Sequence, residues 1–264
     1  AVGTPAKKEG DGVDLTQLYT VVKDLENLID KPALIVIKST VPVGTNRKIR
    51  GILQKAHPKI QIDIVSNPEF LREGSAVNDF LFPDRVVIGV ESKSAKSIIK
   101  KIYGFLESTT PIIYTDLESA ELIKYASNSF LATKISFINK ISQIADHANA
   151  DIHEIKKGIG SDSRIGNEFL NAGLGYGGSC FPKDIKALIN FEKKFKIDHS
   201  LFSVVEEINN QQFFIFYKKI IDAIGQKRLK RSSFMIWGLS FKPNTNDVRD
   251  SIALRLIRLL TDQV

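Results

Sequence analysis

The sequence is poor in the residues that build disulfide scaffolds and membrane spans. Its 264 residues contain a single cysteine, Cys180, which excludes an intramolecular disulfide. It has no run of about 18 apolar residues, the length that a transmembrane helix needs. The opening residues, AVGTPAKKEGDG, lack the apolar core of a signal peptide. From these absences we expect a cytoplasmic protein.

A large excess of one charge is also absent. The formal net charge is +7, and basic residues gather only in two short clusters, Lys193–Lys196 and Lys227–Arg231. We expect both clusters to be solvated surface instead of a nucleic-acid patch, although the charge suits small anionic ligands. Hydrophobic residues at 43% and charged residues at 25% are ordinary for a globular protein.

Helix and strand patterns alternate through the first 116 residues. Apolar residues recur at helical spacing from Leu15 to Ile29, and Pro32 then separates this helix from the buried strand ALIVIKST. Further patterns predict helices at about 46–56 and 95–106, strands at IDIVSNP, RVVIGV and PIIYT, and an irregular stretch at 69–83. The alternation predicts an α/β fold with a mainly parallel sheet covered by helices.

The alternation stops at Leu117, where one helical pattern runs to about Ala148 without proline or glycine. Helical patterns follow on both sides of a glycine-rich segment, and FMIWGLSF then reads as the first strand of another α/β unit. The opening AVGTP reads as the end of a strand and its loop, so both ends look cut. We therefore predict three regions, at residues 1–116, 117–224 and 225–264, the last of them truncated.

The most informative segment is NAGLGYGGSCFPKD, residues 171–184. Glycines let a ligand approach the backbone and expose N–H groups to an anion such as a diphosphate. Pro182 is typical of a first helical turn, which would place Cys180 near a helix N-terminus, where the thiolate is favoured. We predict that Cys180 is a nucleophile. The alternative is a small buried apolar residue.

The same segment contains the pattern G-x-G-x-x-G at Gly173, Gly175 and Gly178. This spacing is typical of dinucleotide-binding loops when it follows a strand and opens a helix. No valine- or isoleucine-rich strand precedes it here. We therefore do not interpret it as a dinucleotide fingerprint.

Six motifs occur along nearly the whole chain in the order found in one enzyme family: VGTP, KSTVPVGT, NPEFLREGSAVNDFLFPDRVVIG, AELIKYASNSFLATKISFINKI, SRIGNEFLNAGLGYGGSCFPKD and GLSFKPNTNDVRDS. On these motifs the sequence resembles the UDP-glucose 6-dehydrogenase type of the UDP-glucose/GDP-mannose dehydrogenase family. The resemblance implies a Rossmann-like NAD-binding region without its opening fingerprint, a helical central domain with a long spine helix, and the start of a UDP-binding α/β domain.

The resemblance also implies the reaction. Enzymes of this type oxidise the primary alcohol of UDP-glucose to the carboxylate of UDP-glucuronate with two NAD, and a cysteine holds the intermediate as a thiohemiacetal and then a thioester. GDP-mannose dehydrogenase is the nearest alternative. Enzymes acting on N-acetylated UDP-sugars usually carry a histidine before the thiol and lack the Lys-Asp pair of GGSCFPKD, which makes them poorer matches.

By resemblance, six residues are expected to be catalytic. Cys180 is the nucleophile, Lys124 stabilises oxyanions, and Asn128 holds a water or a sugar hydroxyl. The last two are four residues apart on the long helix and so share one face. Glu69 and Asp184 are candidate acids or bases, between which the sequence does not choose, and Thr40 would contact nicotinamide or the catalytic water.

The ligand-binding residues implied by the resemblance form two sets, with no metal. The expected cofactor contacts are Val2, Gly3, Thr4, Pro5, Ala6, Ser39, Thr40, Val41, Glu73, Lys183 and Arg249. The expected substrate contacts are Glu69, Phe70, Leu71, Arg72, Glu73, Lys124, Asn128, Arg164, Asn171, Ala172, Gly173, Leu174, Gly175, Tyr176, Gly177, Phe241 and Lys242. Arg164 is expected to reach the site of a neighbouring subunit.

We expect a homodimer formed through the long helix. Competing hypotheses are a dehydrogenase of the 6-phosphogluconate or hydroxyacid type, which needs no thiol, a non-catalytic nucleotide-sugar-binding protein, and a basic nucleic-acid-binding module. Replacing Cys180 separates the enzyme hypotheses, and the salt dependence of polynucleotide binding tests the last.

Overall fold

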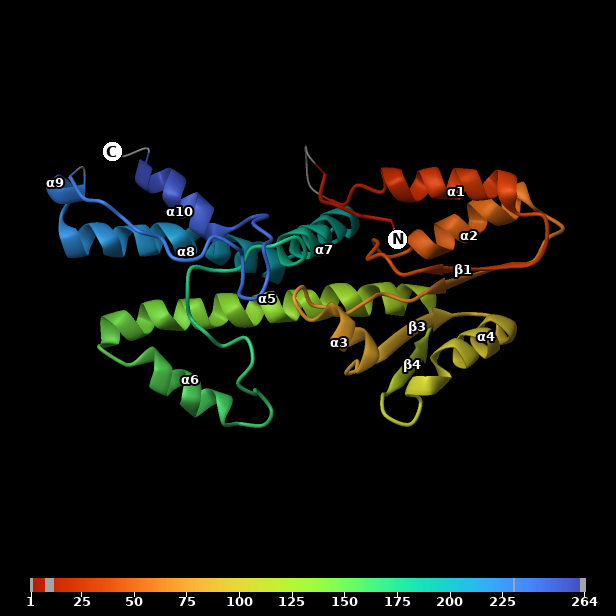
Figure 1. The fold of residues 1–264 in the computed structure, drawn as a ribbon, viewed down its shortest axis with the longest axis horizontal. Coiled ribbons are helices and arrows are strands. Elements are labelled where there is room, and N and C mark those ends of the chain that lie inside the picture. Colours follow the sequence, from red (N-terminus) through yellow and green to blue (C-terminus); the bar gives the residue numbers. More distant parts are fainter. Residues whose placement is uncertain (1, 8–11, 230, 262–264) are drawn as a thin grey trace. The chain divides into compact units, whose positions relative to one another are not determined.

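The computed structural model describes residues 2–7, 12–229 and 231–261 (Figure 1). The chain divides into two compact units, Ala1–Ser127 and Asn128–Val264, which we describe separately. The long helix α5, Leu117–Ala148, contributes residues to both units and has the bounds that the sequence predicts. None of the helices in the described ranges is long and apolar enough to cross a membrane.

The first unit contains a four-stranded sheet in the order β1-β2-β3-β4. Strands β1 (Ala33–Ile37) and β2 (Ile62–Ser66) are parallel, as are β3 (Val86–Val90) and β4 (Ile112–Thr115). Strands β2 and β3 pair antiparallel over only two residues each. The mainly parallel α/β sheet expected from the sequence is therefore confirmed.

Helical connections explain why β1 is parallel to β2 and β3 is parallel to β4. Two parallel strands need a connection of a dozen or more residues, because the chain must return to the end of the sheet at which the first strand began. Helices α2 (Thr45–Ala56) and α4 (Lys93–Tyr103, continued by the 3-10 turn Gly104–Leu106) make these connections. The 67–85 connection between β2 and β3 contains only α3 (Ala76–Leu81). This short helix lies inside the stretch predicted to be irregular, and six residues are too few to show a helical period.

Two hydrophobic clusters form the core of this unit. Helix α1 (Thr16–Leu28) runs beside α2 over β1 (Figure 1), and Leu18 and Val22 pack with Ile49 and Leu53. Helix α4 contributes Ile99 to a second cluster with strand residues of β2 and β3. The helical spacing of apolar residues in the sequence therefore identifies the buried faces correctly.

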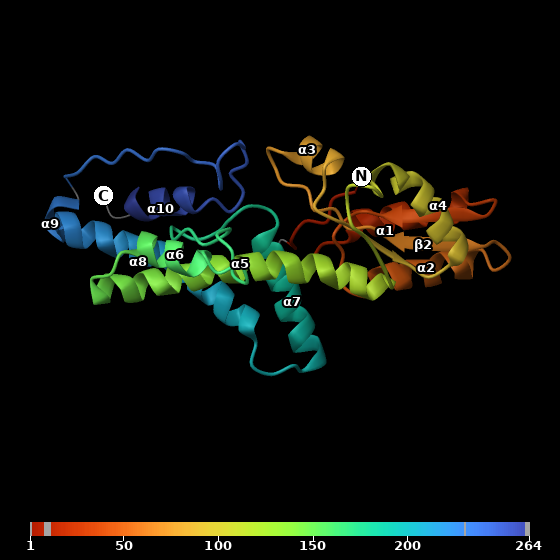
Figure 2. The same cartoon turned by 90° about the horizontal axis from the view of Figure 1, so that it is seen from below.

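The second unit is helical in its described residues. It contains the later turns of α5, then α6 (Ile152–Gly160), α7 (Phe181–Phe195), α8 (Leu201–Ile224), α9 (Gln226–Leu229) and α10 (Ile252–Thr261). Helices α7 and α8 are joined by a short connection (Figure 2) and pack through Ile185, Ile189 and Val205. Lys193, Lys194 and Lys196 are exposed, as are Lys227, Arg228 and Arg231, so the expectation of solvated basic clusters is confirmed for these residues.

The strand predicted at FMIWGLSF is wrong for the structure as described, because these residues adopt no strand. Met235 is 87% exposed and Trp237 is 94% exposed. A strand exists only when its N–H and C=O groups pair with a neighbour, and no described segment pairs with this one. The apolar run alone did not reveal whether a partner strand is present. The division into three regions stays a prediction.

Candidate active site

Cys180 lies at the start of α7 in the second unit. It occupies the N-cap position, Phe181 and Pro182 form the beginning of the helix, and the thiol is exposed and makes no capping hydrogen bond. Its Sγ lies 3.7 Å from the Ser179 hydroxyl. The predicted position at a helix N-terminus is confirmed, and the alternative of a buried apolar cysteine is wrong.

Asp184 lies in the first turn of the same helix and is 1% exposed. It accepts a hydrogen bond of 2.6 Å from the Asn128 amide and forms an ion pair with Lys183. A buried carboxylate is stable only when such partners compensate its lost hydration. The structure therefore brings together Asn128, Lys183 and Asp184, three of the residues predicted for the site.

Removing the Asn128 amide should leave one oxygen of Asp184 buried without its donor. We predict that Asn128→Ala lowers the free energy of unfolding by about 1–3 kcal/mol, the usual cost of an unsatisfied buried polar group. Urea denaturation of the chain measures this. The control Thr133→Ala removes a hydroxyl that bonds only within α5, at Ser129 O, and should change stability by less than about 0.5 kcal/mol. Equal midpoints for the two variants would contradict the prediction.

The glycine-rich loop before Cys180 is closely packed. Gly178 has a φ of +82°, and a Cβ there would lie 2.6 Å from the Phe241 ring. A Cβ on Gly177 would lie 2.1 Å from the Asp250 carbonyl oxygen. The Gly178 N–H donates to Arg249 O at 2.9 Å. Only glycine fits these positions, and the packing brings the predicted substrate residues Gly177 and Phe241 together.

The same loop is not a dinucleotide fingerprint. It connects α6 to α7, and no strand precedes it in the described part of the second unit. Its rejection on sequence grounds is therefore supported, because that motif requires a strand, a tight turn and a helix in succession.

In the first unit, two segments predicted to contact the cofactor are bound to each other. The Ser39 hydroxyl donates to Val2 O at 2.7 Å, and the Thr4 hydroxyl donates to Thr40 O at 2.9 Å. Both contacts lie just beyond the carboxyl end of β1, where parallel sheets bind ligands. The half-buried Thr40 hydroxyl has no hydrogen-bond partner among the described residues, so it can serve a ligand or a water.

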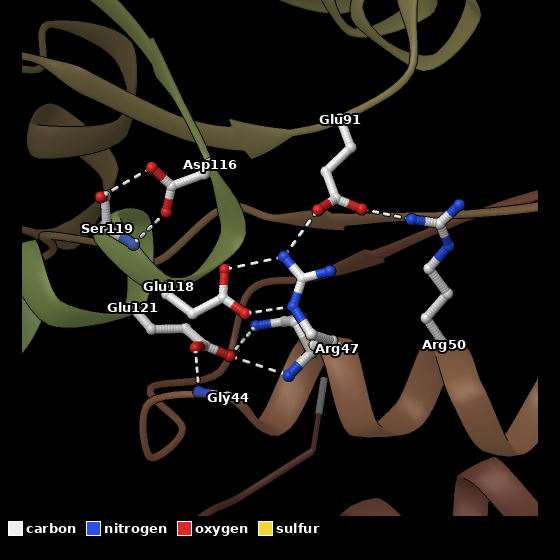
Figure 3. Close-up of polar contacts among 9 residues, drawn as sticks. Gly44, Arg47, Arg50, Glu91, Asp116, Glu118, Ser119 and Glu121 are labelled. Atoms are coloured by element: carbon white, nitrogen blue, oxygen red, sulfur yellow. Dashed lines mark hydrogen bonds and ion pairs between the residues drawn. The ribbon is translucent and has the colours of Figure 1, made fainter.

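The end of this loop is fixed by Glu121, a residue that the sequence reasoning missed. Its carboxylate, 2% exposed, accepts hydrogen bonds from Gly44 N at 2.6 Å, Asn46 N at 2.8 Å and Asn46 Nδ2 at 2.6 Å (Figure 3). Gly44 is left-handed, with a φ of +88°. Burial raises the pKa of Glu121, and the hydrogen bonds from Asn46 and Gly44 oppose that effect. Glu121 thereby ties α5 to the N-terminus of α2.

A second layer of ion pairs lies at the surface around this contact. Arg47 bonds Glu118 at 2.5 Å and Glu91 at 2.6 Å, and Arg50 also pairs with Glu91 (Figure 3). Hydrogen bonds to Glu118 and Glu91 raise the pKa of Arg47. The Arg47 side chain is 52% exposed, so these pairs are screened by solvent and contribute little stability.

The two glutamates of α5 provide a matched test. Glu121→Gln replaces one buried acceptor with an NH2 group that faces backbone donors, so we predict a loss of about 1–3 kcal/mol of unfolding free energy. Glu118→Gln alters only the exposed layer and should cost at most about 1 kcal/mol. Thermal or urea unfolding of both variants measures the difference. A larger loss for Glu118→Gln would show that the surface ion pairs, not the buried contact, anchor α2.

Phe70 and Lys124, both predicted to bind substrate, also lie together. The Lys124 ammonium is 4.9 Å from the centre of the Phe70 ring, and the Arg85 guanidinium is 4.1 Å from it. Lys124 is 5% exposed. A cation over a ring face gains about 0.5–2 kcal/mol, more when it is desolvated. Phe70 therefore holds the Lys124 ammonium in place, and Arg85 is a further neighbour that the sequence reasoning missed.

Several other predicted residues make local contacts. Glu69 accepts from Leu71 N at 2.5 Å. Arg72 binds Asp79 at 2.6 Å, and its hydrogen bonds hold the pKa of Asp79 well below the usual range.

Arg164 and Arg249 each pair with an aspartate two residues earlier, and both side chains are exposed. The Asn171 side chain accepts from Lys156, and Lys242 lies over the Phe241 ring. Exposed ion pairs such as those of Arg164 and Arg249 contribute little stability.

Glu121 could have been found from spacing, because it precedes Lys124 by three residues and Asn128 by seven on one helix. Arg85 gave no such signal. It stands immediately before β3, and only the fold brings Phe70, from the 67–85 connection, under its guanidinium.

Comparison with known proteins gives consistent matches along the chain. Residues 1–107, 118–211 and 235–264 match the models of the NAD-binding, central and UDP-binding domains of the UDP-glucose/GDP-mannose dehydrogenase family. The chain is 46% identical over 261 residues to UDP-glucose 6-dehydrogenase TuaD of Bacillus subtilis, covering 98% of this chain and 56% of that protein.

Two solved structures are also similar. A UDP-glucose dehydrogenase from Pyrobaculum islandicum matches with a TM-score of 0.86 at 36% identity, over 100% of this chain and 61% of that one. A GDP-mannose dehydrogenase from Pseudomonas aeruginosa matches with a TM-score of 0.58 at 31% identity, over 100% and 60%. The chain thus spans about 56–61% of the length of these proteins. The similarity confirms the Rossmann-type α/β fold expected from the sequence.

Proposed function

Because this chain belongs to the UDP-glucose/GDP-mannose dehydrogenase family, we propose that the protein containing it is an NAD-dependent UDP-glucose 6-dehydrogenase that produces UDP-glucuronate. The observation that carries the proposal is the exposed Cys180 thiol at the N-terminus of α7. A simple alcohol dehydrogenase needs no such thiol. A non-catalytic binding protein needs no nucleophile beside a buried Asp184–Asn128 pair.

Cys180 would retain the half-oxidised sugar. The first oxidation removes a hydride and the hydroxyl proton from the C6 alcohol and leaves an aldehyde. The Cys180 thiolate adds to the aldehyde carbon, forming a C–S bond, and the resulting thiohemiacetal loses a second hydride to become a thioester. Water then cleaves the C–S bond, releasing the carboxylate and returning the thiol. A reactive aldehyde is never released.

Other residues of the proposed site would carry charge and protons. The Lys124 ammonium, held against Phe70, suits the stabilisation of oxyanions on the aldehyde and the tetrahedral intermediates. Asn128 and Asp184 can together orient a water or a sugar hydroxyl. Asp184 and Glu69 are both candidates for the base that deprotonates the alcohol or the hydrolytic water.

The residues at the carboxyl end of β1 fit the nicotinamide end of NAD. The segments at Val2–Ala6 and Ser39–Val41 are joined by two hydrogen bonds, which present the Thr40 hydroxyl at a defined place. When bound, NAD supplies the hydride acceptor for both oxidations. Lys183 and Arg249 are proposed as further contacts, and Glu73 as one shared with the substrate.

UDP-glucose is preferred over GDP-mannose as the substrate for two reasons. The curated UDP-glucose 6-dehydrogenase relative is 46% identical to this chain, and the solved GDP-mannose dehydrogenase is 31% identical. The segment GGSCFPKD also resembles the UDP-glucose type. The sugar nucleotide would be bound by the loop Asn171–Gly177 with Phe70–Arg72, Phe241 and Lys242, and by Arg164 from a neighbouring subunit.

The stoichiometry of the intact protein tests the proposal. We predict two NADH per UDP-glucose consumed, and little or no NADH with GDP-mannose. Cys180→Ser should abolish the second oxidation, because serine is a far weaker nucleophile at neutral pH. Ser161→Ala, an exposed hydroxyl at the end of α6, is the control and should retain two NADH. One NADH per sugar in the wild-type protein would indicate a simple alcohol dehydrogenase instead.

A homodimer through α5 is part of the proposal. Three large apolar side chains at seven-residue spacing on this helix, Phe130, Phe137 and Ile144, are 65%, 51% and 58% exposed. Such a stripe is typical of a helix that packs against a partner helix. We predict that Phe137→Glu shifts the intact protein from dimer to monomer in sedimentation velocity, whereas Lys140→Glu, a charge change at an exposed residue of the same helix, leaves the dimer intact. A monomeric wild-type protein would refute this arrangement.

A further inference from the structure

Three buried amide side chains bind the backbone of the glycine loop before Cys180. The Gly173 N–H donates to Asn139 Oδ1 at 2.8 Å, and Gln212 Nε2 donates to Gly173 O at 2.9 Å. The Tyr176 N–H donates to Asn209 Oδ1 at 2.7 Å, and Asn209 Nδ2 donates to Tyr176 O at 3.0 Å. We call Asn139, Asn209 and Gln212 the amide clamp.

The chemistry of the clamp is specific. A carboxamide presents a donor and an acceptor in one plane, so Asn209 satisfies both backbone groups of Tyr176 at once. An aspartate of the same shape would place an oxygen against the Tyr176 carbonyl. All three side chains are at most 7% exposed, and a buried group of this kind is costly to leave unsatisfied.

Gly175 leaves room for the Asn209 side chain of the clamp. Its φ is +107°, and a Cβ there would lie 2.6 Å from Asn209 Oδ1. The glycine therefore allows the amide to approach the backbone as closely as it does. Leu174 and Tyr176 anchor the loop through their side chains in hydrophobic clusters, whereas Gly173 and Gly175 have no side chain to contribute. The backbone groups of Gly173 and Tyr176 are held by amides from α5 and α8.

We propose that Asn209, with Asn139 and Gln212, is a positioning residue for the sugar-nucleotide loop. The inference rests on the proposed function, in which Asn171–Gly177 bind the substrate. Glycines lose more conformational freedom on ordering than other residues, and binding would bear that cost if the loop were loose beforehand. The clamp orders the loop before the substrate arrives. Because amides are neutral, it does so without placing a negative charge near the diphosphate.

A purely structural role makes a different prediction. If the amides only stabilised the helical unit, their loss would weaken every activity of the protein together. If the clamp positions the loop, its loss lowers the affinity for the sugar nucleotide. The affinity for NAD stays unchanged, because the proposed nicotinamide contacts lie mainly in the first unit. The two Michaelis constants therefore separate the roles.

The test compares Asn209→Asp with Asn210→Asp in the intact protein. The two variants make the same chemical change one residue apart, and Asn210 is exposed, with no described hydrogen bond from its side chain. For Asn209→Asp we expect the KM for UDP-glucose to rise at least about tenfold, as for a lost buried hydrogen bond, with the KM for NAD within about twofold of wild type. Asn210→Asp should match wild type in both.

A second measurement needs no turnover. UDP-glucose should protect Cys180 from iodoacetamide, and labelling is followed on the peptide that contains Cys180. The concentration that gives half protection should rise about tenfold in Asn209→Asp, in parallel with KM. If that variant does not fold, Gln212→Met, which removes the donor to Gly173 O without adding charge, takes its place, with the exposed Gln211→Met as its control.

Unchanged KM and protection in the clamp variants would overturn the clamp and leave the proposed function intact. A parallel rise in the KM values for UDP-glucose and NAD would also overturn it, in favour of a structural role. The proposed function would be overturned if UDP-glucose neither protected Cys180 of the wild-type protein from iodoacetamide nor supported the reduction of NAD. The positioning role of the clamp would then be overturned as well.

Discussion

The main constraint on this structure is that a loop built largely of glycine must hold one conformation. Gly173, Gly175, Gly177 and Gly178 have no side chains with which to anchor themselves, and groups on other segments bind the loop backbone at Gly173, Tyr176 and Gly178. The amide clamp holds the first half of the loop, and the Arg249 carbonyl and the Phe241 ring enclose the second. Cys180 follows directly and begins α7. The position of the thiol therefore depends on contacts that lie away from it.

The same solution appears in the first unit, where Glu121 binds the N–H groups of Gly44 and Asn46 and so fixes the loop that contains Thr40. In both units α5 supplies a buried polar group, and in the second unit α8 supplies two more, Asn209 and Gln212. Along this one helix lie Glu121, Lys124, Asn128 and Asn139, all at most 8% exposed. A helix is suited to this task because its own backbone is satisfied, which leaves its side chains to serve other segments.

Much of this could be predicted from the sequence, because the patterns involved are local. The apolar spacing of α1, α2 and α5 gave their extents closely, and Pro182 indicated the helix start that places Cys180. Other features depend on partners distant in sequence. Strand β2 pairs antiparallel with β3, and FMIWGLSF forms no strand in the described residues. Both features depend on which segments lie beside each other in the fold, and an apolar run in the sequence does not identify its partner. Asn209 is unremarkable on an amphipathic helix until the fold sets it against Tyr176.

The central claim is that Cys180 acts as the nucleophile, and alkylation tests it most directly. Iodoacetamide is applied to the intact protein, and the modified fraction of the Cys180 peptide is measured by mass spectrometry beside the rate of NADH formation with UDP-glucose. The account predicts that the rate falls in proportion to Cys180 modification and reaches zero when the residue is fully modified. A protein with fully alkylated Cys180 that still forms two NADH per UDP-glucose would contradict it.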